Sequence, residues 1–314
     1  MKIFDMHADI GMDVADKRKS GEKDILKRFH LPKLESGEIA GINMACFFDG
    51  SESVDDAVFM MESLREEIDQ NSDCIHLSLD GSMSDSKLNV IMSVEGMGFL
   101  KEGDDALAMV DFMHNIGIRC ASLSWNDQNM LSTGVLGDPR RGLTPLGKEV
   151  IQKLNEKKII IDVSHANEKT FYDICSVSKS PIIATHSNTR EKQNVERNLT
   201  SQQIKSIVHS GGLIGLVAVK KFISSNPNRQ NALELAQHAR SMKELVGVDH
   251  LCIGFDYMDF LKEPFGPHSM AVDLQDASMS QNLIQALSTV GFTKEEVTKI
   301  AHQNVIGFIQ KQLQ

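Results

Sequence analysis

Histidines and acidic residues stand at the ends of five short apolar segments of this 314-residue chain. They are His7, Asp9, Glu95, His165, His186 and Asp256. Imidazole and carboxylate groups are ligands that zinc and similar cations take from proteins, and they also transfer protons. Three carboxylates cannot be buried beside one another unless a cation compensates their charge. Because six donors exceed the about four of a closed zinc site, the set predicts two metals bridged by a carboxylate.

Eight short apolar runs, which we predict to be strands, carry or precede these residues. They cover residues 2–9, 42–49, 89–96, 119–127, 158–165, 180–187, 212–219 and 250–257. The last four are nearly continuous in apolar residues, which is typical of strands buried on both faces of a parallel sheet. The helical segments between them begin at recognisable caps, which are Thr144 before Pro145, Thr200 with Gln203, and Thr293 with Glu296. The pattern predicts an α/β fold, a single (β/α)8 TIM barrel that spans residues 1–314 as one domain.

A TIM barrel would bring the candidate residues together, because the carboxyl ends of its strands converge on one mouth. The candidates end the first, third, fifth, sixth and eighth predicted strands. His7 and Asp9 are two residues apart in FDMHADI, so they share one face of the first strand and can reach one metal. The long irregular segments 127–145 and 258–270 follow the fourth and eighth strands, where a barrel builds its active site.

Each candidate also has a simpler explanation. A histidine and an aspartate at a barrel rim can be solvated or hydrogen-bonded without any metal. Glu95 before Gly96 fits an acid in a loop. His165 after Ser164 fits the beginning of a helix. The agreement of five strand ends favours a metal site over these separate explanations.

The composition of the chain excludes several classes of protein. Hydrophobic residues make up 41% of the chain and charged residues 24%, which excludes disorder as the main state. A formal net charge of −10 gives no footprint for nucleic acid or for an anionic membrane. No run approaches 18 apolar residues, and the start, MKIFDMHADI, lacks a signal-peptide pattern. Five scattered cysteines, never in a C-x-x-C pair, indicate a reduced compartment, so we predict a cytoplasmic protein.

A series of motifs follows in a fixed order along nearly the whole chain. They are D-x-H-x-D in FDMHADI, the E-G of SVEGMG, GLTPLGKEVI, IDVSHAN, ATHSNTR, RNLT, IGFDY and the asparagine of HQNVIGF. In identity and order they resemble the motifs of the membrane dipeptidase (renal dipeptidase) family, binuclear zinc peptidases within the amidohydrolase-like barrels. The chain is similar to the bacterial, cytoplasmic members, and we expect none of the lipid anchoring of the mammalian ones.

The resemblance implies a metal role for five of the candidates. His7 and Asp9 would hold one zinc ion, and His165 and His186 would hold the other. Glu95 would bridge the two ions and thereby take part in catalysis. The implied cofactor is therefore two Zn²⁺ per chain.

The resemblance also implies the reaction, which is hydrolysis of dipeptides, including those with a C-terminal D-amino acid. A hydroxide bridging the two zinc ions would attack the peptide carbonyl, and Asp256 would orient and deprotonate the bridging water from which that hydroxide forms. Arg197, in VERNLT, would pair with the terminal carboxylate of the substrate, which suits its planar guanidinium. The simpler explanation of Arg197 is a surface arginine that balances Glu196 or Glu191. A homodimer is an expectation from the family alone.

Two positions depart from the family pattern. Mammalian members carry a substrate-contacting histidine at the end of strand four, whereas SLSWNDQN has Trp125 there. We predict that Trp125 and Asn126 bind substrate, with Asn126 as a replacement donor, and the alternative is that Trp125 packs under the loop. In GFDYMDF, Met258 replaces a family aspartate. This leaves open the role of Asp259, and that of His268 in the following loop.

Two other functions fit parts of the pattern. Another binuclear metal hydrolase on the same barrel would act on a lactone, a cyclic amide or a phosphoester, and the H-x-D motif alone does not exclude it. A peptide carboxylate needs Arg197, whereas a neutral lactone does not. A non-catalytic ligand-binding barrel would be indicated by loss of a metal ligand or of Asp256, and the chain retains them all.

Overall fold

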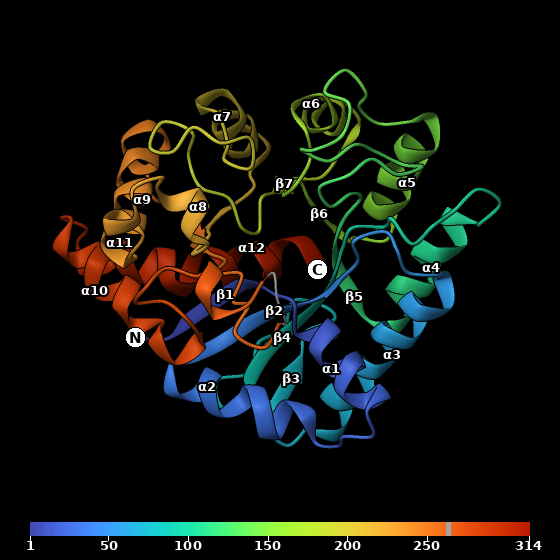
Figure 1. The fold of residues 1–314 in the computed structure, drawn as a ribbon, viewed down its shortest axis with the longest axis horizontal. Helices are drawn as coiled ribbons and strands as arrows, with labels where there is room; N and C mark the ends of the chain where they lie inside the picture. The colour runs from blue at the N-terminus through green and yellow to red at the C-terminus, as the bar shows by residue number, and fades with distance from the viewer. Residues whose placement is uncertain (262–264) are drawn as a thin grey trace.

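The strands form one parallel sheet that curves into a barrel (Figure 1). The computed structural model describes residues 1–261 and 265–314, and the strands within them are β1 (Ile3–Ala8), β2 (Ile39–Phe47), β3 (Ile75–Leu77), β4 (Leu88–Glu95), β5 (Ile118–Ser122), β6 (Ile160–Asp162), β7 (Ile182–Ile183), β8 (Ile214–Leu216) and β9 (Leu251–Ile253). Neighbouring strands follow the order β7-β6-β5-β4-β2-β1-β9-β8, and each of these pairings is parallel. Burial of these apolar strands on both faces favours this arrangement.

The two ends of this strand order are joined by a single bridge. Ala184, which follows β7, pairs in parallel with Ile214 of β8 and so closes a ring of eight strands. β3 lies outside the ring because it pairs with β4 at residues 88–90, whereas β5 pairs with β4 only from Met92 onward. The predicted (β/α)8 TIM barrel is confirmed, and β3 is an addition that the apolar pattern did not predict.

Three of the strands that precede candidate residues are shorter than we predicted. β6, β7 and β9 end at Asp162, Ile183 and Ile253, so His165, His186 and Asp256 each stand three residues beyond the last strand residue. The chain leaves the sheet there because its backbone turns: φ is +67° at His165 and +63° at Asp256. These side chains therefore project from turns at the carboxyl ends of the strands and do not belong to the strands themselves.

Helices pack around the outside of the barrel, and the last helix in the chain, α12 (Asn304–Leu313), packs across its N-terminal end (Figure 1). Among the described residues they are α1 (Ile10–Lys19), α2 (Leu31–Ser36), α3 (Val54–Gln70), α4 (Ala106–Ile116), α5 (Pro145–Glu156), α6 (Glu168–Val177), α7 (Ser201–Ser210), α8 (Lys220–Ile223), α9 (Ala232–Val246), α10 (Gln281–Thr289), α11 (Lys294–Thr298) and α12 (Asn304–Leu313). π-Helical turns cover Leu26–His30 and Lys299–Gln303, and 3₁₀ turns cover Pro227–Arg229, Pro267–Ser269 and Ala277–Met279.

The predicted helix beginnings are confirmed. Thr144 caps α5 by accepting a hydrogen bond from the Gly147 N–H. Thr200 with Gln203, and Thr293 with Glu296, form complete capping boxes at α7 and α11.

An apolar cluster fills the barrel toward the N-terminal ends of its strands. It contains Phe4, Met6, Ile91, Cys120, Ile160, Ile183, Leu213 and Cys252, together with Val305, Phe308, Ile309 and Leu313 of α12. A Cβ on Gly41 would lie 2.3 Å from the Phe4 ring, so this glycine leaves the space that the ring occupies. The Nζ of Lys158, just before β6, donates a hydrogen bond to the Gln314 carbonyl, which places the end of α12 at this end of the barrel. The N-terminal end is thus closed by apolar packing.

Candidate metal centre

A β-bulge in β1 sets the direction of the His7 side chain. Phe4 and Met6 belong to the inner cluster, so strict alternation along the strand would turn His7 away from the barrel interior. Between Asp5 and Ala8 the register shifts, and Met6 and His7 together face the single residue Asn43 of β2. The Nδ2 of Asn43 donates to the Met6 carbonyl at 3.0 Å and satisfies the bulged backbone. Bulges re-aim side chains, and this one turns His7 into the mouth of the barrel.

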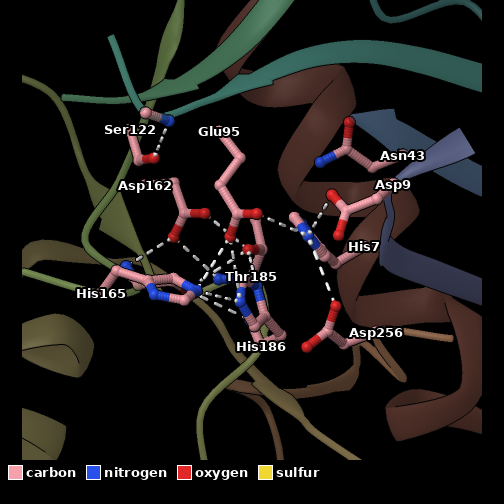
Figure 2. A network of polar contacts seen from close by, with 12 residues as sticks. His7, Asp9, Asn43, Glu95, Ser122, Asp162, His165, Thr185, His186 and Asp256 are labelled. Atoms are coloured by element: carbon pink, nitrogen blue, oxygen red, sulfur yellow. Dashed lines mark hydrogen bonds and ion pairs between the residues drawn. The ribbon is translucent and has the colours of Figure 1, made fainter. Parts of the chain in front are cut away.

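Glu95 lies at the middle of the centre (Figure 2). It is the last residue of β4 and is almost fully buried. Its Oε1 is 3.0 Å from His165 Nε2 and 3.2 Å from His186 Nε2. Its Oε2 is 3.6 Å from His7 Nε2. The two oxygens of one carboxylate thus face histidines on opposite sides of the barrel mouth.

The remaining candidates complete a second group on the β1 side. His7 Nε2 lies 3.3 Å from Asp9 Oδ1 and 3.8 Å from Asp256 Oδ1. The His7 ring stacks on that of His186 with centroids 3.9 Å apart, so the two groups are contiguous. The six residues predicted from the ends of five apolar segments therefore lie together, in two potential metal-binding sets: His7, Asp9 and Asp256, and Glu95, His165 and His186.

The donor atoms of these residues fit metal ions. His7 Nε2, Asp9 Oδ1 and Glu95 Oε1 are buried without a hydrogen-bond partner. His165 donates through Nδ1 to Asn126 Oδ1 at 2.9 Å, so in the neutral ring Nε2 carries no proton and has a lone pair free for a metal. The Nε2 atoms of His165 and His186 are only 3.0 Å apart. Converging lone pairs and carboxylates in a buried site repel one another unless a cation lies between them, so the donor set suits zinc.

The pKa shifts in the cluster have the same origin. Burial opposes charge on the His7 imidazole, yet the Glu95 and Asp9 carboxylates outweigh it and raise its pKa well above the usual range. Burial, followed by repulsion from Glu95, raises the pKa of Asp9 to about 6. Burial also raises the pKa of Asp256 well above its ordinary value. Each shift means that the pocket lacks positive charge, which protons or metal ions can supply.

Arg197 is buried beside the β7 side of the centre. Its Nη1 donates to Ser187 Oγ at 3.2 Å and its Nη2 to the His186 carbonyl at 3.3 Å, while its Nε has no partner. Burial, together with the positive charge of Arg197, lowers the pKa of His165 to about 4. The simpler explanation, a surface arginine paired with a neighbouring glutamate, does not describe this side chain, because it is buried and neither glutamate is among its hydrogen-bond partners.

Trp125 and Asn126 follow β5 and lie next to His165. The Trp125 ring lies 5.0 Å from the Phe47 ring and 5.9 Å from the His165 ring, between centroids. Asn126 orients His165, as described above, through its amide oxygen. Trp125 is thus half-buried and close to the centre, and both its packing under the loop and substrate binding by these two residues remain predictions.

The sequence left open the roles of Asp259 and His268. Both lie in the segment 258–270, of which residues 262–264 are outside the described part of the chain. Asp259 forms an ion pair with Lys33. The carbonyl of His268 accepts a hydrogen bond from Lys220 Nζ. Neither observation brings these residues to the metal centre.

Several residues at the centre were missed by the sequence analysis. Asp162 accepts hydrogen bonds from the Ser164 and Thr185 backbone, and Thr185 contacts His186 through its hydroxyl. Asn43 supports the bulge at His7. The signal was present in each case as a polar residue within an apolar run, in KIIIDVSH, SPIIATHS and INMACFF. None of these three residues ends its run, which is the feature that the predicted residues share.

A parallel barrel with histidines and carboxylates gathered at the carboxyl ends of its strands defines a metal-dependent hydrolase. The chain matches the model of the membrane dipeptidase family (peptidase family M19) over residues 1–313, and it belongs to this family. It is therefore a metallopeptidase of the dipeptidase class.

Individual proteins are similar to large parts of this chain. The chain is 23% identical over 312 residues to Dipeptidase tcpJ of Claviceps purpurea, covering 94% of this chain and 72% of the relative. It is 31% identical over 230 residues to an uncharacterised Klebsiella pneumoniae protein from the pqqA 5′ region, covering 70% and 80% of the two chains. A metallopeptidase from Rhodobacter sphaeroides, solved with a phosphinate mimic of the dipeptide L-Ala-D-Ala, has the same fold, with a TM-score of 0.86, 22% identity and 99% of both chains covered.

Within residues 1–261 and 265–314, no helix is both long enough and apolar enough to cross a bilayer.

Proposed function

We propose that this protein is a two-zinc dipeptidase that hydrolyses dipeptides, including those whose C-terminal residue has the D configuration. The observation that carries the proposal is the position of Glu95, whose Oε1 faces His165 and His186 while its Oε2 faces His7. A carboxylate between two separate groups of donors is suited to bridging two cations. His7 and Asp9 would hold one zinc and His165 and His186 the other. Bound zinc supplies a water of lowered pKa and polarises the peptide carbonyl.

Asp256 is suited to proton transfer. Its backbone N–H donates to the His7 carbonyl at 3.1 Å, which fixes the turn that carries it. Its carboxylate then lies 3.8 Å from His7 Nε2, at the edge of the metal ligands. We assign it the roles of accepting the proton of the attacking water and delivering a proton to the leaving amine.

Arg197 is suited to hold the C-terminal carboxylate of the substrate. It carries a buried guanidinium on the β7 side of the centre, and its Nε is unpaired. A planar guanidinium binds a carboxylate through two parallel hydrogen bonds. A carboxylate held beside the metal ligands places the adjacent peptide bond over them, which restricts the enzyme to short peptides.

The D configuration is supported by the Rhodobacter sphaeroides protein, which binds a mimic of L-Ala-D-Ala on the same fold. Further substrate contacts would come from Trp125 and Asn126, which follow β5 and lie next to His165.

The test is a kinetic screen of L,L and L,D dipeptides with parallel metal analysis. We expect two zinc ions per chain and hydrolysis of both series, with activity lost on chelation and restored by zinc. Activity that survives complete metal removal would contradict the proposal. The screen includes a lactone, a cyclic amide and a phosphoester, and a preference for any of these over dipeptides would favour the alternative hydrolases.

Arg197 is tested by its substitution with methionine. Arg197→Met should raise KM for dipeptides tenfold or more, which corresponds to about 1.4 kcal/mol of lost binding free energy. It should also abolish the preference for dipeptides over dipeptide amides. The matched control is Arg140→Met, because Arg140 lies on the loop after β5, is exposed and pairs only with Asp138 among the described contacts. An unchanged preference in Arg197→Met would remove its assigned role.

A further inference from the structure

Two buried carboxylates outside the proposed ligand set make the same pattern of hydrogen bonds. Asp162 Oδ1 accepts from the Ser164 N–H at 2.9 Å and from the Thr185 N–H at 3.0 Å. Asp5 Oδ1 accepts from the His7 N–H at 3.2 Å and from the Phe255 N–H at 2.9 Å. In both cases one donor lies two residues further along the same segment. The other donor comes from the neighbouring strand of the barrel.

Each carboxylate therefore joins two segments that carry proposed zinc ligands or the proposed catalytic group. Asp162 ties the turn that bears His165 to Thr185, the residue before His186. Asp5 ties His7 to Phe255, the residue before Asp256. Because β6 and β7 are paired over only two residue pairs, and β1 and β9 over one with a single further bridge between Ala8 and Tyr257, the ladders alone hold these turns weakly.

The Asp162 side has an additional connection through a hydroxyl (Figure 2). The Thr185 hydroxyl donates to Asp162 Oδ2 at 2.5 Å. Its proton is thereby used, so its oxygen accepts from His186 Nδ1 at 2.8 Å. This fixes the proton of His186 on Nδ1 and leaves Nε2 for a metal, which is how partners behind a ligating histidine tune metal binding. Asp5 has no such connection, because its Oδ2 is buried without a partner.

The turn at Thr185 is also confined from its other side. A Cβ on Gly215 or on Gly254 would lie 1.8 Å from the Thr185 carbonyl oxygen. These glycines allow β8 and the segment after β9 to approach the turn as closely as backbones can. The turn is thus held between a carboxylate on one side and two glycines on the other.

Asp162 also lies near enough to His7 and His186 to be a metal ligand itself. Its hydrogen bonds argue against this role. Both of its oxygens are occupied by donors, two backbone N–H groups on Oδ1 and a hydroxyl on Oδ2. The oxygens of Asp9 and Glu95, in contrast, include atoms with no partner.

We propose that Asp162 and Asp5 are positioning residues for two different halves of the metal centre, Asp162 for the zinc at His165 and His186, and Asp5 for the zinc at His7 and for Asp256. The inference rests on the proposed two-zinc function. It assigns each carboxylate to one ion, so its signature is the loss of affinity for one zinc and not for the other.

The experiment measures the two successive zinc dissociation constants of the metal-free full-length protein by chelator competition, with Tm as a measure of folding. Asp162→Asn should weaken one zinc 10- to 100-fold and leave the other within threefold. Thr185→Val, which keeps the shape of the side chain, should weaken the same zinc. Asp5→Asn should weaken the other one. Asparagine retains an acceptor oxygen for the backbone N–H groups, so these variants are chosen to keep the fold.

Double variants identify which zinc is affected. The effect of Asp162→Asn should vanish in a His165→Ala background, where that ion is already lost, and persist in a His7→Ala background. The matched control is Glu67→Gln, since Glu67 is also a buried carboxylate that accepts a backbone N–H, from Leu26, but lies away from the centre. Glu67→Gln should lower Tm without changing either zinc affinity.

Three outcomes would overturn the inference. Equal weakening of both ions by Asp162→Asn would mean a general structural role. Weakening by Asp162→Asn with no effect of Thr185→Val would mean that Asp162 is itself a ligand. A wild-type protein that binds fewer than two zinc ions would overturn the two-zinc function, and this inference with it. That failure is distinguishable because it appears before any substitution is made.

Discussion

The two ends of the barrel are built on opposite principles. At the N-terminal end, apolar side chains of the strands pack against Phe308 and its neighbours on α12, and the interior is filled. At the C-terminal end, histidines and carboxylates are equally buried, and His7 Nε2, Asp9 Oδ1, Glu95 Oε1 and Asp5 Oδ2 lack a hydrogen-bond partner. Apolar burial stabilises a fold, whereas buried unpaired polar atoms cost free energy. We infer that apolar packing at the N-terminal end stabilises the fold and offsets the free-energy cost of the buried polar atoms at the C-terminal end.

Backbone strain follows the same division. The described non-glycine residues with positive φ are Asp24, Glu38, Lys158, His165 and Asp256. The first three are exposed, and only His165 and Asp256 are buried, both at the C-terminal mouth. Left-handed backbone costs about 1 kcal/mol or more for such residues and is kept where the surrounding structure holds it in place. Substitutions at the two ends should therefore have separable effects on activity and on stability.

The largest expected effect is at the C-terminal end, in Glu95→Gln. The substitution keeps the shape of the side chain but removes the charge that faces His7, His165 and His186. We expect kcat/KM to fall a thousandfold or more, which corresponds to a rise of about 4 kcal/mol in activation free energy, and at least one zinc to be lost. Steady-state kinetics and chelator competition check this. Activity within tenfold of the wild type would contradict the bridging role.

The next effect is at the N-terminal end, in Phe308→Ala. The ring is buried in the inner cluster, so its removal should lower the free energy of unfolding by about 3–4 kcal/mol. At a temperature where the variant stays folded, kcat/KM should remain within twofold. Denaturant titration and kinetics measure the two effects. The control is Gln310→Ala on the exposed face of α12, which should change stability by less than about 0.5 kcal/mol. A tenfold loss of activity in Phe308→Ala would show that the two ends are coupled.

The sequence predicted the helix beginnings, the buried strands and the residues of the metal centre for a physical reason. Helix caps such as Thr200 with Gln203, and the burial of apolar runs, depend on residues close in the chain, so local patterns are enough to predict them. The metal residues were found because a parallel barrel brings the ends of its strands together, whatever their separation in sequence.

What the sequence could not predict depends on contacts between distant segments. The bulge at His7 depends on its register against Asn43, and the hydrogen bond from His165 to Asn126 joins the turns after two strands. The ion pair of Lys33 with Asp259 links residues 226 positions apart. The lengths of β6, β7 and β9 were overestimated because an apolar residue, Val163, Ala184 or Phe255, still follows the end of each strand, and hydrophobicity does not reveal where the backbone leaves the ladder.

A third prediction uses pH to separate the metal centre from a histidine outside it. His238 on α9 accepts from the Thr189 N–H through Nδ1 and donates through Nε2 to the Ile223 carbonyl, so it is held neutral. Burial lowers its pKa from 6.5 to about 4, against the smaller opposing effects of the Ile223 carbonyl and Glu234, and with further lowering by Lys192 and Arg229. The unfolded chain therefore binds more protons than the folded one between pH 6.5 and 4.

The contribution of His238 to stability is thus complete above pH 6.5 and is lost as the pH falls through 4. The difference of about 2.5 pKa units corresponds to about 3 kcal/mol in the free energy of unfolding. Denaturant titrations of the metal-free protein at pH 7 and pH 4.5 measure it. In His238→Gln the stability difference between these pH values should be smaller, whereas in the exposed His209→Gln it should be unchanged. An equal loss of stability in wild type and His238→Gln would assign the acid sensitivity to the metal centre.

The smallest predicted effect tests whether stability and chemistry stay separate even beside the centre. Thr200 begins α7 only three residues after Arg197, and its Oγ1 accepts from the Gln203 N–H at 3.2 Å while Gln203 Oε1 accepts from the Thr200 N–H at 2.9 Å. Thr200→Ala removes the first of these bonds and should lower the free energy of unfolding by about 1 kcal/mol. Thr200→Ser, which keeps the hydroxyl, should lower it less.

KM for dipeptides should stay within twofold in Thr200→Ala, because Arg197 is held by Ser187 and by the His186 carbonyl and not by the helix cap. Parallel measurement of Tm and KM separates the two effects. A tenfold rise in KM together with the small loss of stability would mean that the cap of α7 positions the Arg197 guanidinium. The residues that affect the chemistry would then extend further from the mouth of the barrel than the hydrogen bonds of Arg197 indicate.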